Sequence, residues 1–285
     1  MNTNDFKTRT EIIEEQSTCP EGYWVLGLDT GYSSVKGKSP NKRFAFPYYA
    51  KKVPEGRAFL REAEDSDIRY RDETGEWVVG KLAYDEVNAK EIVDSEQELT
   101  GRHRFFTDIF RVTTRTGIAL GLMSNKYGSC EDKHIMIEAG LPPKYINDAV
   151  DLREALCGKH DFEVKVGAGN WIKYSIELKE NDIQVMPQPL GSLVSASTNA
   201  NGRQLKTAIQ YWSGNVIVFD PGYGTLDTYI VKRGQVIGKG ETFPEYGMHE
   251  VFARTCRDIE KEFKEVIGDR IAAICASHNV TVDYA

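Results

Sequence analysis

The stretch VIVFDPGYGTLDTYIV, residues Val216 to Val231, places two glycines and two aspartates in a turn between two apolar runs. The flanking runs are rich in β-branched residues, which predicts two paired strands. A tight hairpin needs glycine or asparagine at its tip, but it does not need Asp220 and Asp227 beside that tip. The extra carboxylates therefore indicate a site with chemistry of its own.

A second stretch near the start of the chain, VLGLDTGYSSVKG (Val25 to Gly37), repeats this pattern. Glycine lets the backbone approach a ligand, and successive N–H groups in a turn form an anion-binding concavity. Lys36 adds a positive charge for phosphate. An aspartate cannot bind phosphate directly, but it can hold Mg²⁺ through water. Two unrelated surface hairpins are the alternative interpretation, which would suit a single D-x-G better than a matched pair.

The two turns, facing each other, would clamp a polyphosphate and its magnesium ion. The predicted phosphate-binding residues are Gly31, Tyr32, Ser33, Ser34, Lys36, Gly222, Tyr223, Gly224 and Thr225, and the predicted magnesium-binding residues are Asp29 and Asp220. Asp227 ranks below Asp220, because it could simply cap the turn or accept a backbone hydrogen bond.

The remaining pattern predicts an α/β protein. Strand-like runs occupy residues 23–53, 67–83, 134–141 and 162–186, whereas residues 108–125 and 248–267 have apolar positions at helical spacing. Residues 1–21 are polar, and we expect a short helix or arm there. The basic cluster GRHRFF, residues 101–106, is expected to be a solvated face. Strands carrying loops into helices, repeated with similar turns, indicate two domains built on a duplicated unit.

Composition excludes several classes of protein. The net charge of −7 and pI near 5.4 argue against a broad nucleic-acid-binding face. The five cysteines are scattered without a CxxC pair, which argues against a zinc site and fits a reduced, cytoplasmic protein. The N-terminal segment lacks the apolar core of a secretory signal, and no apolar run is long enough to span a bilayer.

Several motifs resemble those of one superfamily. DTGYSSVK resembles the first phosphate loop of the actin, sugar kinase and heat-shock chaperone ATPases, and DPGYGTLD resembles their second. HIMIEAGLPPK (residues 134–144) resembles the strand and proline turn before the catalytic region. IQVMPQPLGSLVSAS (residues 183–197) is similar to the segment linking the two domains, and FPEYGMHEVF (residues 243–252) to the turn after the second hairpin. The similarity is to bacterial and plasmid actin-like ATPases of the ParM/StbA kind, over roughly residues 23–266.

The resemblance implies an actin-like ATPase fold with two related, ribonuclease H-like domains around a nucleotide cleft. Residues 1–21 would be an N-terminal extension, 22–188 the first domain and 189–285 the second. It implies Mg²⁺-dependent hydrolysis of ATP, with GTP possible, in which Asp220 and Gln188 are catalytic. Gln188 matches a glutamine that orients the attacking water in actin, but ParM-type proteins often carry glutamate there. A structural amide in a buried junction is the alternative for Gln188.

The resemblance also implies head-to-tail filaments that move plasmid or phage DNA through a DNA-bound adaptor, without direct contact to nucleic acid or membrane. One motif departs from the family: the Gly-Gly turn that cradles adenosine is missing, and only 58 residues follow Asp227. We therefore expect the second domain to be shortened at its C-terminal end. A nucleotide-dependent scaffold that does not hydrolyse, and a metabolite kinase of the same superfamily, remain alternatives.

Overall fold

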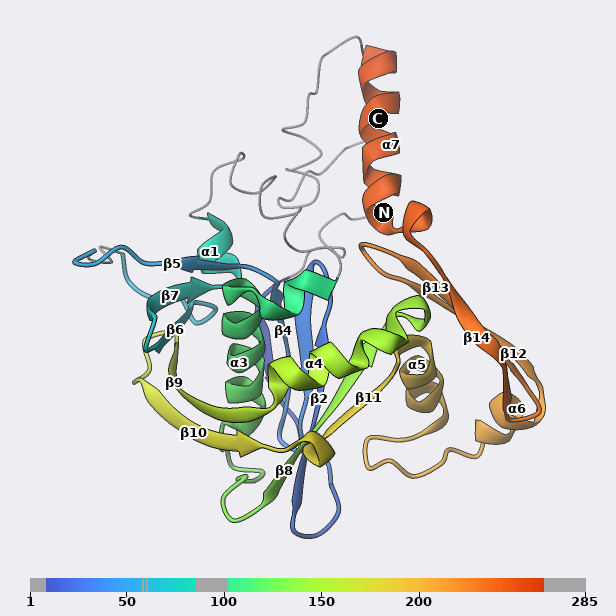
Figure 1. Ribbon diagram of the computed structural model, residues 1–285, viewed down its shortest axis with the longest axis horizontal. Helices are drawn as coiled ribbons and strands as arrows, with labels where there is room; N and C mark the ends of the chain where they lie inside the picture. Colours follow the sequence, from blue (N-terminus) through green and yellow to red (C-terminus); the bar gives the residue numbers. More distant parts are fainter. Residues whose placement is uncertain (1–8, 58, 60, 86–101, 264–285) are drawn as a thin grey trace.

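The computed structural model describes residues 9–57, 59, 61–85 and 102–263, which form three sheets with flanking helices (Figure 1). The strands are β1 (Glu11–Glu14), β2 (Tyr23–Thr30), β3 (Ser34–Lys38), β4 (Lys42–Pro47), β5 (Ala50–Lys52), β6 (Ile68–Asp72), β7 (Gly75–Val79), β8 (His134–Leu141), β9 (Gly158–Val166), β10 (Ile172–Leu178), β11 (Ile183–Pro187), β12 (Asn215–Pro221), β13 (Leu226–Lys232) and β14 (Gln235–Phe243). The α-helices are α1 (Lys81–Asp85), α3 (Asp108–Leu122), α4 (Ala149–Leu156), α5 (Gln188–Ser197), α6 (Ala208–Ser213) and α7 (Met248–Phe263), and the 3₁₀ helices are η2 (Arg102–Phe106), η3 (Pro143–Asp148), η4 (Glu180–Asp182) and η5 (Pro244–Tyr246).

The six-stranded sheet has the order β1-β4-β3-β2-β8-β11. Strands β2, β3 and β4 pair antiparallel, whereas β8 is parallel to β2 and β11 is parallel to β8. Helix α3 lies directly on this sheet through two glycines. A Cβ on Gly117 would lie 2.8 Å from Leu28 Cδ1, and one on Gly121 would lie 2.5 Å from Leu26 Cδ1. Both leucines are consequently buried, and each such burial stabilises the fold by about 2 kcal/mol.

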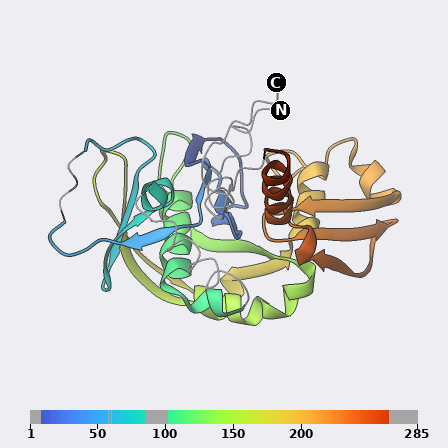
Figure 2. The same cartoon turned by 90° about the horizontal axis from the view of Figure 1, so that it is seen from above.

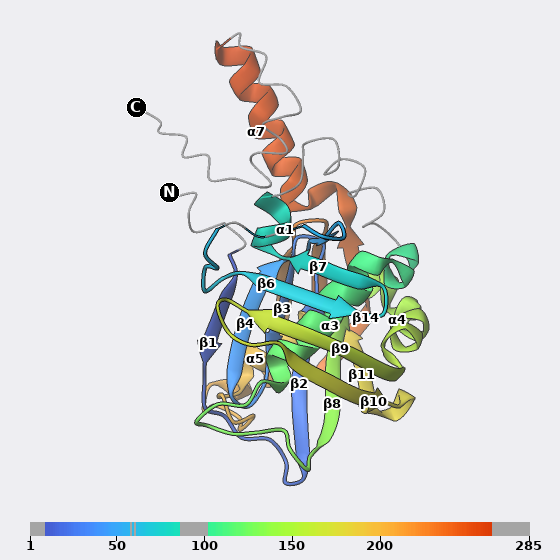
Figure 3. The same ribbon diagram turned by 90° about the vertical axis from the view of Figure 1, so that its left-hand side faces the viewer.

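The five-stranded sheet has the order β10-β9-β6-β7-β5 and is antiparallel throughout. Its strands lie across α3 (Figure 3). The rings of Tyr70, Phe162 and Tyr174 stack in a row on this sheet, with centroid separations of 5.6 Å and 5.5 Å. All three belong to the same core cluster as Leu26 and Leu28, so α3 is the element that joins the two sheets.

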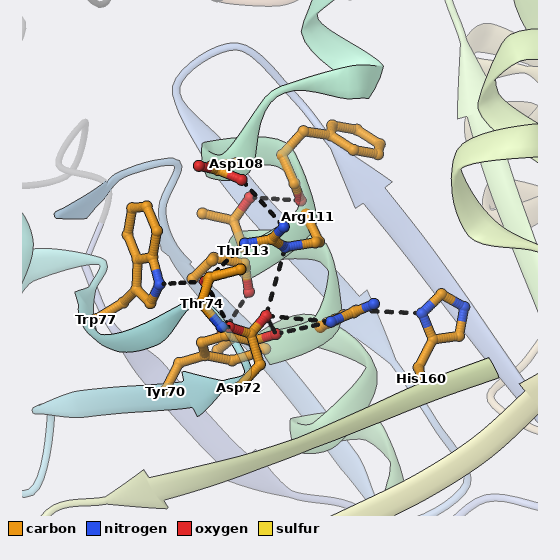
Figure 4. Close-up of polar contacts among 12 residues, drawn as sticks. Tyr70, Asp72, Thr74, Trp77, Asp108, Arg111, Thr113 and His160 are labelled. Atoms are coloured by element: carbon orange, nitrogen blue, oxygen red, sulfur yellow. Dashed lines mark hydrogen bonds and ion pairs between the residues drawn. The ribbon is translucent and has the colours of Figure 1, made fainter. Parts of the chain in front are cut away.

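A buried carboxylate, Asp72, ties the five-stranded sheet to α3 (Figure 4). It accepts hydrogen bonds from Tyr70 Oη at 2.7 Å and Thr74 Oγ1 at 2.6 Å, and it pairs with Arg111 and Arg115 of α3. Burial alone would raise the pKa of Asp72, but the bonds from Thr74 and Tyr70 and the charge of Arg111 outweigh it, and the pKa is lowered. The carboxylate therefore remains ionised and holds both arginines.

His160 on β9 extends this network, and we expect it to make the stability of the protein depend on pH. Its Nδ1 accepts from Arg115 Nε at 3.1 Å, and its Nε2 donates to the Leu156 carbonyl at 2.9 Å, which fits the neutral ring. Burial lowers the pKa of His160, and the charge of Arg115 lowers it further. Because the folded-state pKa lies below the unfolded value near 6.5, the stability contributed by the neutral ring is complete above about pH 6.5. It is lost as the pH falls through that value towards the folded-state pKa.

We expect urea unfolding at pH 7.5 and pH 5.5 to show a larger loss of stability in the wild type than in His160→Gln. The exposed His103 supplies the matched control, because His103→Gln should retain the wild-type pH dependence. Equal losses in the wild type and His160→Gln would show that His160 does not titrate in this range.

The three-stranded sheet, β12-β13-β14, lies at the opposite end of the molecule from the five-stranded sheet (Figure 2). Helices α5 and α6 cover one of its faces, where Leu193, Tyr229 and Val231 form a small core. Helix α7 follows β14 through η5 and projects away from the sheets (Figure 1).

The first strands of the two halves are built alike. Asp29 of β2 faces Lys36 of β3, and Asp220 of β12 faces Asp227 of β13, so each aspartate sits seven residues before its cross-strand partner. This shared register supports the prediction of a duplicated unit.

The two halves differ in what covers them. Leu26 and Leu28 precede Asp29 by three and one residues and are 0% and 4% exposed beneath α3. Their counterparts before Asp220, Ile217 and Phe219, are 57% and 64% exposed. No described helix covers that face of the three-stranded sheet as α3 covers the first.

Most predicted elements occur where the pattern placed them, including the helix within 108–125 and the strand at 134–141. In the polar N-terminal segment, where a short helix or arm was expected, residues 11–14 are extended and form β1, which pairs with β4. One expectation was wrong. In the cluster at residues 101–106, Arg104 and Phe105 are each 5% exposed, because the arginine packs against aromatic rings. The predicted helix beyond residue 263 lies outside the described residues.

Candidate functional site

The first predicted phosphate loop connects β2 to β3 and is compact. A Cβ on Gly31 would lie 3.1 Å from the Ser34 carbonyl oxygen, so a side chain there would crowd the turn. Ser34 is 4% exposed and Thr30 is 7% exposed, which anchors both ends of the loop. Lys36 lies on β3 directly across from Asp29.

The second predicted phosphate loop connects β12 to β13 with the same geometry. A Cβ on Gly222 would also lie 3.1 Å from a carbonyl oxygen, here that of Thr225, and the Gly222 N–H donates to this oxygen at 2.8 Å. Thr225 is 6% exposed, like its counterpart Ser34. The similarity between the two sequences therefore extends to backbone shape.

The first turn of α7 holds the second loop in place. The N–H groups of Met248 and His249 donate to the carbonyls of Gly222 and Tyr223 at 3.0 Å and 3.1 Å. The His249 ring also donates from Nδ1 to the Tyr223 carbonyl at 2.9 Å. This ring is partly exposed, but it supports the loop.

Asp29 lies at the centre of the site. Burial raises its pKa, the charges of Lys36 and Arg104 oppose this rise, and the negative charge of Asp220 adds to it. Gln188 Nε2 donates a hydrogen bond to Asp29 Oδ1 at 2.9 Å across 159 positions of sequence. The Asp29 carboxylate is thus affected by Lys36, beside the first loop, and by Asp220, beside the second loop.

Asp220 has the corresponding environment on the second loop. Burial raises its pKa and Lys36 opposes the rise. One lysine thus acts on two desolvated carboxylates, one from each loop. Burial disfavours the ionised form of both side chains. A further cation between them would stabilise that ionised form.

Gln188 reaches this centre from the junction between the two halves. It is the first residue of α5 and follows Pro187, the last residue of β11. Gly140 on the neighbouring β8 leaves it room, since a Cβ there would lie 2.8 Å from Gln188 Cγ. The amide is therefore packed and hydrogen-bonded as well as close to the site.

Asp227 occupies the position that Lys36 holds in the first loop. It is 2% exposed and accepts from Thr225 Oγ1 at 3.0 Å. Burial raises its pKa, hydrogen bonds from Thr242 and Thr225 oppose the rise, and Asp220 adds to it. Its hydrogen bond with Thr225 stabilises the turn.

Arg104 is the residue that sequence reasoning missed. Its Nη2 donates to the Thr30 carbonyl at 2.6 Å, and its guanidinium lies 4.7 Å from the centroid of the Tyr32 ring. It supports the first loop from behind, and its charge lowers the pKa of Asp29. The adjacent aromatic residue Phe105, also buried, was the signal in the sequence that Arg104 faces inwards, whereas Arg102 and His103 of the same cluster are exposed.

The donor set fits a hydrated magnesium ion. Among the described residues, no group of three or more His, Cys, Asp and Glu side chains could hold a metal by itself. Mg²⁺ in nucleotide sites keeps several waters and uses one or two carboxylates together with substrate phosphates. Asp29 and Asp220, desolvated and interacting, are suitable partners for such an ion.

In the described part of the chain, no helix is long and apolar enough to cross a membrane.

Solved structures of similar fold come from actin homologues. A non-polymerisable quadruple mutant of pCBH ParM aligns with a TM-score of 0.61 at 20% identity, covering 84% of this chain and 69% of that one. The apo psk41 ParM protein aligns at 0.58 and 15% identity, over 90% and 77% of the two chains. A 15-stranded ParM filament from Clostridium botulinum aligns at 0.55 and 17% identity, over 86% and 70%.

No curated protein matches the sequence of this chain. A family model, described as the N-terminal domain of actin-like proteins, matches residues 27–191. This match includes the first phosphate loop, the strand β8 and Gln188, and it spans more than half of the 285 residues. The predicted actin-like fold is confirmed, and the chain belongs to the actin-like protein family.

Proposed function

We propose that this protein binds a nucleoside triphosphate with Mg²⁺ between its two loops and hydrolyses it. The observation that carries the proposal is the electrostatic interaction of Asp29 with Asp220 and of Lys36 with both, on strands that flank two loops with the same register. Desolvated carboxylates beside glycine turns and a lysine favour phosphoryl transfer, in which catalysis is largely positioning and charge neutralisation.

Each group has a defined part in this proposal. Backbone N–H groups and hydroxyls of the two loops bind phosphate oxygens, and Lys36 neutralises their charge. Asp29 and Asp220 hold the hydrated ion through its waters. When bound, Mg²⁺ supplies a positive charge that neutralises the phosphate oxygens. Gln188, fixed by Asp29, orients the attacking water.

We further propose that nucleotide binding drives self-assembly into filaments that segregate plasmid or phage DNA. Solved structures with this fold include the Clostridium botulinum ParM filament, an Alp12 filament and a filament of AlfA from Bacillus subtilis plasmid pLS32. A head-to-tail contact between identical subunits propagates as a helix when its rotation does not close into a ring. The net charge of −7 favours contact with DNA through an adaptor protein.

Light scattering and phosphate release, measured together with ATP or GTP and with or without Mg²⁺, test the proposal. Mg²⁺-dependent scattering accompanied by phosphate release supports a polymerising hydrolase. Phosphate release without scattering would support the proposed hydrolysis and contradict the proposed assembly into filaments. Neither signal with either nucleotide, from protein with an intact fold, would contradict the proposed function.

A second candidate is a nucleotide-dependent scaffold that does not hydrolyse. The hydrogen bond from Gln188 to Asp29 favours it, because a side-chain amide held by a carboxylate has fewer groups left for water. Scattering that depends on nucleotide but releases no phosphate would identify this case.

Gln188→Ala tests whether Gln188 takes part in hydrolysis. If Gln188 orients water, phosphate release should fall by up to about 100-fold while nucleotide affinity changes little, since a small misplacement of the nucleophile has effects of this size. Gln184 on β11 is the matched control, because its exposed amide lies outside the site and Gln184→Ala should behave as wild type. Unchanged turnover in Gln188→Ala would leave this residue a structural role only.

A further inference from the structure

The side chain of Tyr32 bridges the two phosphate loops. Tyr32 belongs to the first loop, yet a Cβ on Gly224 of the second loop would lie 2.6 Å from its Cδ2 and 3.1 Å from its Cε2. Gly224 does not have the positive φ that requires glycine. The absence of a side chain at this position is therefore explained by the aromatic ring that rests on its backbone.

Arg104 supports the same ring. Its guanidinium lies 4.7 Å from the Tyr32 ring centroid and 5.3 Å from that of Phe105, while Nη2 binds the carbonyl of Thr30. Arg104 is 5% exposed, and no described carboxylate forms an ion pair with it. A buried guanidinium placed by two rings and one carbonyl holds Tyr32 in a fixed position relative to the backbone of the first loop.

The contact continues from Gly224 into α7. A Cβ on Gly247 would lie 2.6 Å from the carbonyl carbon of Gly224, so these two backbone segments touch. The residues after Gly247 donate hydrogen bonds to the second loop, as described above. Arg104, Tyr32, Gly224 and Gly247 thus form a continuous series of contacts from the first loop to the first turn of α7.

We infer that Tyr32 is a positioning residue that couples the first phosphate loop to the second loop and to α7. Because the ring is held by Arg104 and presses on Gly224, ordering of the first loop by a ligand also orders the second loop and the start of α7. The coupling to a ligand rests on the proposed function, whereas the contact of Tyr32 with Gly224 does not.

Hydrogen–deuterium exchange tests this coupling with and without Mg²⁺ and a non-hydrolysable ATP analogue. In Tyr32→Ala without ligand, exchange across residues 220–227 and 247–250 should rise about tenfold over wild type, a size typical of coupling between sites. The analogue should still protect the first loop of Tyr32→Ala but should no longer protect residues 220–227. Tyr32→Phe keeps the ring carbons that make the contact and should restore wild-type protection of both loops.

Gly224→Ala provides a second route to the same result, because the added Cβ displaces the ring without removing any group. Alone, it should raise exchange at residues 220–227 as Tyr32→Ala does. In the double variant the Cβ meets no ring, so exchange should equal that of Tyr32→Ala. If the exchange rate in the double variant instead rises by the product of the two single-variant increases, the two residues act independently. That result would show that Gly224 serves another purpose and would overturn the inference.

The failure of the inference can be told from the failure of the proposed function. Wild-type exchange at residues 220–227 in Tyr32→Ala, with and without the analogue, overturns the coupling. An analogue that protects neither loop of the wild type contradicts nucleotide binding, while the ligand-free comparison still decides whether Tyr32 joins the loops. Unchanged exchange in the strands of the five-stranded sheet confirms that each variant is folded. If Tyr32→Ala does not fold, Arg104→Met replaces it and should show the same exchange pattern.

Discussion

Replacing Asp220 with alanine is expected to reduce phosphate release about 1,000-fold at saturating nucleotide and Mg²⁺, the upper range for removal of one preorganised electrostatic group. Asp220 contributes the carboxylate of the second loop, and Asp29 alone would be left to hold the hydrated ion. Single-turnover phosphate release measures the effect on the chemical step separately from product release.

The same substitution should leave the fold intact. The raised pKa of Asp220 shows that the folded protein disfavours its ionised form, so its removal relieves a cost instead of breaking a stabilising contact. The urea midpoint should therefore be equal to or above that of wild type. Asp161→Ala is the control, because this half-exposed carboxylate on β9 pairs with Lys159 at 3.0 Å away from the loops. Turnover of Asp220→Ala equal to that of Asp161→Ala would refute the assignment.

The sequence predicted the two loops well because their chemistry is local. A glycine turn between two β-rich runs determines backbone shape over a few residues, and Asp29 and Asp220 sit at the same place in each. The prediction that the two loops face each other came from the duplicated pattern together with the family resemblance. Their electrostatic interaction in the structure agrees with that arrangement.

What the sequence could not predict depends on partners distant in the chain. Arg104 is separated by 74 positions from the Thr30 carbonyl that accepts its hydrogen bond. The segment around it, RHRFF at residues 102–106, resembles a solvated cluster when taken alone. Strand β1 was missed for a similar reason. The segment Glu11–Glu14 has only two apolar residues, and it becomes a strand because β4 offers an unpaired edge.

Gln188 and Tyr32 show the limit most clearly. The sequence placed Gln188 at the junction but could not show that its amide would bind Asp29, 159 positions away. Tyr32 was predicted only as part of a phosphate-binding backbone. The contact of its ring with Gly224 depends on the relative position of two domains, which no local pattern encodes.

Replacing Lys36 with methionine is expected to weaken nucleotide binding about 100-fold, or about 3 kcal/mol, the upper range for losing a hydrogen bond between an exposed lysine and a charged group. Methionine keeps the apolar stem and removes the charge. Lys38 is the matched control, since it lies two residues along β3, on the same side of the strand, and pairs with Glu15 at 3.6 Å. Titration with a fluorescent ATP analogue should show near wild-type affinity for Lys38→Met.

The pH dependence of turnover adds a second readout for Lys36. Lys36 lowers the pKa of both Asp29 and Asp220, so its removal should raise both pKa values beyond the rise that burial already causes. If both carboxylates must be ionised to hold the hydrated ion, the acidic limb of the phosphate-release profile should move to higher pH in Lys36→Met and stay in place in Lys38→Met. Weaker binding with an unmoved acidic limb would mean that Lys36 contacts phosphate but that Asp29 and Asp220 do not titrate in the active complex. An unchanged affinity would remove Lys36 from the site altogether.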